Sequence, residues 1–316
     1  MDLNNAIEIL RQSYNVIQPA IPSVVAALMA TVLIKKNTRQ QELEKLKHGK
    51  FQEVANELLE SGQITHLEYY KCRNFLDIAK KADEYYRNEQ DSRDNEYGYA
   101  EEFDFDWFLR FFDAAGNISN EKMKDYYAKI LSGEISRPGE FSLRTLDTLY
   151  NMSQYEMQLF SELSDIVLDG SFFFSSLGDI GQKLNEKYGY NNDALRLLEE
   201  CGVLNGLKFE NTIELASKEA VGFENQGNLL LLTSKSREKL SLTYVSYSLT
   251  KVGKELLSIA MRYTPSDYIF ELGKEIKEKY PELQISIHPF KEVDSETLSY
   301  DSEIDLLKGF CVDGGG

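Results

Sequence analysis

The feature that most constrains this chain is an apolar stretch near its N-terminus. Residues 16–34 read VIQPAIPSVVAALMATVLI, and Lys35, Lys36 and Arg39 follow almost at once. As a helix, the stretch is nearly long enough to cross the hydrocarbon core of a bilayer, and basic residues after such a segment are typical of a cytoplasmic flank. Its large aliphatic side chains have to be buried, either in a membrane or against protein.

The same stretch also fits a buried core or interface helix. Two prolines, a glutamine and a serine interrupt its first third, and the uninterrupted part, residues 24–34, is short and rich in alanine. Acidic residues precede it and basic residues follow it, which is not the pattern of a secretory signal. The side chains expected to form a membrane or assembly helix are Val24, Val25, Leu28, Leu33 and Ile34.

The charge of the chain narrows the choice of partners. Its 52 acidic and 35 basic residues give a formal net charge of −17. Nucleic-acid affinity comes largely from lysine and arginine neutralising the phosphate backbone, so we do not expect the whole chain to bind nucleic acid. An acidic surface favours solubility and basic partners. We expect a protein partner or further copies of the same chain.

Cysteine and histidine indicate no metal or catalytic site. The three cysteines are far apart without any CxxC spacing, and no two of the three histidines lie at a helical spacing. The sequence therefore predicts no cofactor, no metal and no enzymatic activity. An odd cysteine count without a secretory signal indicates a reducing compartment, which predicts a cytoplasmic protein, associated with the inner membrane if residues 16–34 insert.

The fold class predicted from the sequence is mainly α, in five segments. Residues 1–87 read as an N-terminal helical region, in which Thr65 and Glu68 form a capping box. Residues 88–103 are charged and poor in aliphatic side chains, as in a linker that cannot offset its ordering entropy. Residues 104–168 read as a central bundle of four helices. Its helix starts are assigned to Ser119, Ser142 and the Ser153–Glu156 capping box.

The C-terminal half reads as a winged-helix-like α+β region over residues 169–290, followed by an acidic tail, 291–316. Two helices, several strands and a helix begun by Thr250 follow one another there. The second of those helices, near residues 193–201, carries three acidic residues against Arg196, and a DNA-reading helix normally presents more donors. We therefore expect protein contacts rather than a transcription regulator, which stays an alternative.

A family resemblance lies in the central segment. The pattern begins with FDWFLRFFDAA at 105–115, continues with YAKILSGE at 127–134 and ends with PGEFSLRTL at 138–146. This pattern resembles the bacterial family known as domain of unknown function 2806, and more distantly the Abi-alpha proteins linked to phage abortive infection. The resemblance implies no catalytic residue that can be carried over. It does suggest a bacterial defence or stress role.

The same motif contains one candidate partner or ligand site. Pro138 and Gly139 predict a tight turn, and Glu134 and Arg144 stand on either side of it. We expect these two to pair across the turn, with Arg137 as the third member of the site. The favoured function is a non-enzymatic defence or regulatory component acting through protein contacts and self-assembly. A membrane-inserting effector using residues 16–34 is the alternative.

If residues 24–34 do not enter a bilayer, they have to pack on another copy or a partner chain. Replacing Val25 and Leu28 by Asp is then expected to dissociate the assembly, because a buried carboxylate is costly without a partner. Light scattering would report the loss of mass and circular dichroism the retained fold. A wild-type protein that is already monomeric without detergent would show this expectation to be wrong.

Overall fold

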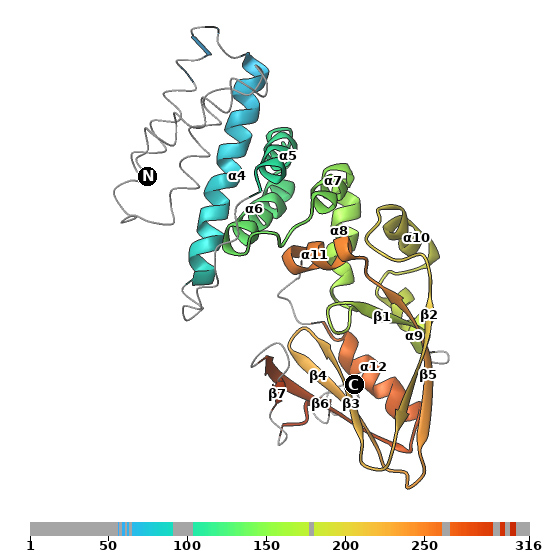
Figure 1. The fold of residues 1–316 in the computed structure, drawn as a ribbon. Coiled ribbons are helices and arrows are strands. Elements are labelled where there is room, and N and C mark those ends of the chain that lie inside the picture. Colours follow the sequence, from blue (N-terminus) through green and yellow to red (C-terminus); the bar gives the residue numbers. More distant parts are fainter. Residues whose placement is uncertain are drawn as a thin grey trace, which may run out of the picture. The chain divides into compact units, whose positions relative to one another are not determined.

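The structure is a computed structural model that describes residues 56, 59, 60, 62, 65–90, 104–176, 180–260, 266–292, 298–300 and 304–307. The chain divides into two compact units, Met1–Gly139 and Glu140–Gly316. Figure 1 shows the helices of the first unit and the mixed helices and strands of the second. The boundary at Gly139 falls inside the segment 104–168 that the sequence groups as one bundle.

Three helices form the described part of the first unit. They are α4 (His66–Gln90), α5 (Phe105–Gly116) and α6 (Glu121–Ser136). Each begins at a residue that accepts bonds from the first backbone N–H groups of the helix. Thr65 and Glu68 form the predicted capping box before α4, Asp104 caps α5 and Asn120 caps α6. The cap assigned to Ser119 is therefore displaced by one residue.

Aromatic side chains fill the core of the first unit. The Phe75 ring of α4 lies edge-on to the ring of Phe108, with centroids 5.8 Å apart, and 5.1 Å from that of Phe112. Trp107 stacks on Phe111 at 5.2 Å. Since all five side chains are at most 9% exposed, the aromatic helix predicted from the sequence packs its apolar face on α4.

The second unit alternates short helices with strands. Its helices are α7 (Leu143–Asn151), α8 (Gln154–Leu163), α9 (Ile180–Lys187), α10 (Asn192–Glu200), α11 (Lys251–Ala260) and α12 (Tyr268–Lys279). Its strands are β1 (Phe172–Ser176), β2 (Phe209–Leu215), β3 (Ala220–Asn225), β4 (Asn228–Ser234), β5 (Leu240–Ser248), β6 (Leu283–Glu292) and β7 (Leu298–Tyr300). Ser142 caps α7, and Ser153 with Glu156 forms the predicted capping box of α8.

The strands form two antiparallel sheets. One has the order β1-β5-β2 and the other the order β3-β4-β6-β7. The β3–β4 hairpin turns at Gln226 and Gly227, which both have positive φ, 48° and 81°, as a two-residue hairpin turn of type I′ requires. The Gln226 side-chain amide donates to the carbonyl of Ser164 and the carboxylate of Asp165, so the tip of the hairpin is fastened to the end of α8.

A carboxylate from α11 completes the start of α7. Ser142 accepts from the backbone N–H of Thr145, as the first residue of a capping box does, but α7 has no acidic residue at its third position. Glu255 supplies the missing carboxylate, because its Oε2 accepts from the Ser142 N–H at 2.8 Å and from the Thr145 hydroxyl at 2.5 Å. The reciprocal bond of a capping box therefore comes from a residue more than a hundred positions away.

The predicted fold class, mainly α with a winged-helix-like C-terminal region, is wrong. Seven strands in two sheets make the described part of the second unit a mixed α+β structure. The sequence predicts no second sheet, because β1, β3 and β7 carry no clear strand pattern and residues 283–287 alternate as in a short edge strand. In the structure that segment is β6, which pairs with β4 on one side and β7 on the other.

Several predicted segments lie outside the described residues. They include the apolar stretch 16–34 with its five candidate assembly residues, most of the linker 88–103, and most of the tail 291–316. Within the part of the chain that the structure does describe, no helix is long and apolar enough to cross a membrane. The membrane and assembly roles of residues 16–34 stay predictions.

The Glu255 contact predicts a defined loss of stability. In Glu255→Ala, the Ser142 N–H and the fully buried Thr145 hydroxyl lose their shared acceptor, which is expected to lower the free energy of unfolding by about 1–3 kcal/mol. Urea denaturation followed by circular dichroism measures the change. Glu278→Ala, an exposed position on α12, is the control and is expected to change stability by less than about 0.5 kcal/mol. Equal stability of the two variants would contradict the assigned role.

Candidate functional site

The site predicted around the Pro138–Gly139 turn is a structural turn in which one acidic side chain is buried. Glu134 is 2% exposed and its Oε1 accepts from the Gly139 N–H at 2.7 Å. Gly139 has φ of 86°, which favours glycine. Arg137 is exposed beside this turn, while Arg144 is exposed on α7 in the second unit. The pairing of Glu134 with Arg144 stays a prediction.

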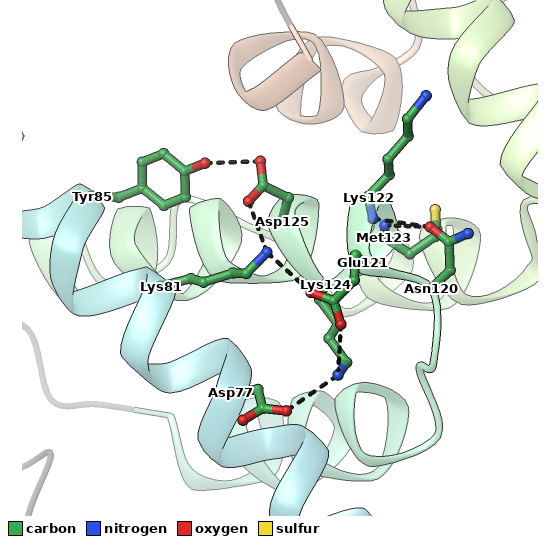
Figure 2. Close-up of polar contacts among 9 residues, drawn as sticks. All are labelled: Asp77, Lys81, Tyr85, Asn120, Glu121, Lys122, Met123, Lys124 and Asp125. Carbon is green, nitrogen blue, oxygen red and sulfur yellow. Dashed lines mark hydrogen bonds and ion pairs between the residues drawn. The ribbon is translucent and has the colours of Figure 1, made fainter.

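A network of ion pairs joins α4 to α6 and was not anticipated from the sequence (Figure 2). The Lys124 ammonium lies 3.3 Å from the Asp77 carboxylate and 3.1 Å from that of Glu121. The Lys81 ammonium lies 3.4 Å from both Glu121 and Asp125. The hydroxyl of Tyr85 donates to Asp125 at 2.8 Å. One side of the network comes from α4 and the other from the first two turns of α6. The network therefore fixes how α4 lies along α6.

The charges of this network largely balance. Two ammonium groups face three carboxylates, and the ammonium of Lys129 lies 5.7 Å from the centre of the Tyr85 ring. The Lys124 side chain is only 7% exposed. Burial alone would lower the pKa of Lys124, but its bonds to Glu121 and Asp77 outweigh burial and raise that pKa. The ammonium groups and carboxylates of this network pair with one another, so they hold the two helices together and present little unpaired charge to a ligand.

The described cysteines and His288 are held in structural roles. Burial raises the pKa of Cys72 and of Cys201 to about 11, with Glu68 and Glu156 adding to the effect, so both are neutral thiols near pH 7 and poor nucleophiles. His288 contacts the Ile304 carbonyl through Nδ1 and the Ser286 hydroxyl through Nε2. Among the described residues, no group of three His, Cys, Asp or Glu side chains is arranged to hold a metal ion.

Exposed apolar side chains are the remaining candidates in the second unit. Leu143 and Tyr150 lie seven residues apart on α7, hence on one face of that helix, and are 39% and 48% exposed. Tyr155 in the first turn of α8 is 67% exposed. We call Leu143, Tyr150 and Tyr155 the α7–α8 surface residues. Sequence spacing does not identify Leu143 as exposed, because it stands at a helical spacing from Leu146 and Leu149, which are both buried.

One segment of the chain matches a known protein family. The family model described as protein of unknown function DUF2806 matches residues 62–171, which confirms the resemblance of that segment to this family. No curated protein and no solved structure matches the chain. The more distant resemblance to the Abi-alpha proteins stays a prediction. The matched segment contains α4 to α6 of the first unit and α7 and α8 of the second.

The α4–α6 network predicts unequal roles for two neighbouring lysines. Lys124→Met keeps the buried aliphatic stem but removes the ammonium, and we expect a loss of about 1 kcal/mol, because its two partners are partly solvated. Lys122→Met is the control, since Lys122 is exposed and points away from the network (Figure 2). Thermal or urea unfolding at low salt, without guanidinium chloride, measures the free energy of unfolding of both variants.

The pH dependence of that difference has a definite sign. A lysine whose pKa is raised by folding contributes stability below its unfolded pKa, about 10.4, and loses it as the pH rises through the folded pKa. The two proteins should therefore differ fully at neutral pH and converge only at strongly alkaline pH. A difference that vanishes between pH 5 and pH 8 would show that the Lys124 ammonium is not its source.

Proposed function

We propose that this protein is a non-enzymatic component that acts through protein–protein contacts. The observation that carries the proposal is the exposure of the α7–α8 surface residues, a leucine and two tyrosines of the family segment that are 39–67% exposed. Tyrosine is enriched at protein interfaces because its ring is apolar and its hydroxyl can still find a polar partner.

The contacts that hold α7 and α8 in place favour a binding role for these exposed side chains. Glu255 fixes the start of α7, and the Ser161 hydroxyl of α8 donates to the Ala260 carbonyl of α11 at 2.8 Å. Side chains on helices held in this way lose less conformational freedom when they bind. The neutral thiols and the self-satisfied ion-pair network support a role without catalysis.

The biological setting that we propose is a bacterial defence or stress system in which the protein acts as an assembly component. This part of the proposal rests on the distant resemblance of residues 105–146 to the Abi-alpha proteins and is tested by phage challenge. Cells that express the chain together with its neighbouring genes should reduce plaque formation by at least some phages. Equal plating across a broad phage panel would count against the defence role.

The triple variant Leu143→Ser, Tyr150→Ser, Tyr155→Ser tests the interface. It should lower self-association or partner binding at least tenfold, because the loss of three apolar anchors removes the side chains that typically dominate an interface. Sedimentation velocity over a concentration series measures assembly, and circular dichroism shows that the fold is kept.

Leu67→Ser is the matched control, because Leu67 on α4 is 64% exposed but lies outside this surface. It should associate like the wild type. If the triple variant assembles and protects cells as well as the wild type does, the α7–α8 surface is not the interface.

A further inference from the structure

We propose that the open edge of β2 binds an extended, lysine- or arginine-rich segment of a partner protein by adding a strand to the β1-β5-β2 sheet. This inference rests on the proposed function, since it names the chemistry of one partner. It concerns a surface separate from α7 and α8, and it is carried by the position of β2, by its side-chain pattern and by its charge.

The position of β2 leaves one side of its backbone available. β2 is the last strand in the order β1-β5-β2 and pairs with β5 over all seven of its residues. No other strand of the described structure pairs with its second side (Figure 1). An unpaired edge presents a row of N–H and C=O groups that can accept an added strand. Seven residues are enough for such a strand.

One face of β2 is mainly apolar. Leu215 on this face is buried, and Ile213, which is half-buried, pairs with the buried Leu242. The exposed Asn211 interrupts the apolar row, and beyond it Phe209 is 47% exposed and Leu207, just before the strand, is 70% exposed. An added strand with apolar residues at alternate positions would cover both.

The other face of β2 carries two glutamates, of which one is not paired within the described residues. Glu210 is exposed and makes no hydrogen bond or ion pair with the described residues. Glu214, four residues further on, binds Lys239. The nearby Lys208 ammonium lies 4.9 Å above the ring of Tyr247 in the neighbouring strand, so its charge already has a favourable contact. A lysine or arginine opposite Glu210 would make a favourable cross-strand pair.

A second copy of the same strand fits this edge poorly. If two β2 strands paired antiparallel around Thr212, Glu210 of each copy would stand opposite Glu214 of the other. Like charges directly opposite each other destabilise an antiparallel pair, and two chains of net charge −17 repel each other in addition. The charge of the edge therefore favours a basic segment of a different protein.

Three capped eight-residue peptides test the proposal with the full-length chain. The first alternates lysine with valine, the second replaces each lysine by glutamate, and the third is the lysine peptide with its two central amides N-methylated. Because neighbouring amides of a strand point to opposite sides, the double methylation blocks either edge. Fluorescence anisotropy at low salt measures binding, and hydrogen exchange locates it.

The lysine peptide is expected to bind and to slow exchange of the amides of β2. The glutamate and the N-methylated peptides should bind at least tenfold more weakly. Glu210→Lys should weaken binding of the lysine peptide by about three- to tenfold, whereas Glu278→Lys, the same charge change at an exposed position of α12, should not.

Three results would overturn the proposal. They are equal binding of the N-methylated peptide, protection of amides outside β2, and no binding of the lysine peptide at all. If peptide binding fails while the wild type assembles through the α7–α8 surface, only the β2 proposal is lost. If the lysine peptide binds but the triple variant of that surface behaves like the wild type, the β2 proposal stands and the α7–α8 interface is lost.

Discussion

The contact between Glu255 and the first turn of α7 is the interaction on which the second unit depends. The first backbone N–H groups of a helix have no partners within the helix. Where such groups are buried, other residues have to supply acceptors. Here a carboxylate from α11 accepts both the Ser142 N–H and the Thr145 hydroxyl. Since α11 follows directly on β5, this contact joins the start of α7 to the helix that continues from the β1-β5-β2 sheet.

The segment that matches the family model is divided between the two units of the chain. Residues 62–171 match one family model, but the chain divides at Gly139 within that segment. The helices α4 to α6 share an aromatic core and the balanced ion-pair network, whereas α7 and α8 pack on elements beyond residue 171, such as α11. The Tyr190 hydroxyl, also outside the matched segment, donates to the Leu159 carbonyl of α8. The second half of the segment therefore needs the C-terminal part of the chain for its own packing.

Local features of the fold could be predicted from the sequence, and non-local ones could not. The two capping boxes and the start of α7 follow from residues three positions apart, and the structure has each of them. Gly202 directly follows the last residue of the α10 cap and has φ of 75°, as glycine at a helix end commonly does. By contrast, β3 is short and contains a glycine, and only its pairing with β4 makes it a strand.

The functional features follow the same rule. Lys124, Asp77 and Glu255 act through partners from other helices, so no local spacing could identify them. The exposure of Tyr150 and Phe209 likewise depends on which faces of α7 and of the β1-β5-β2 sheet other elements cover. The net charge of −17 favours basic partners, and the nature of the partner stays a prediction.

The most direct test of this account is hydrogen exchange of the wild-type chain, followed by mass spectrometry, in rising concentrations of urea. If the family segment is divided as described, the amides of α4 to α6 will open together, and those of α7 and α8 will open with α11 at a different urea concentration. Opening of α4 to α8 as one cooperative unit, independent of α11, would contradict the account.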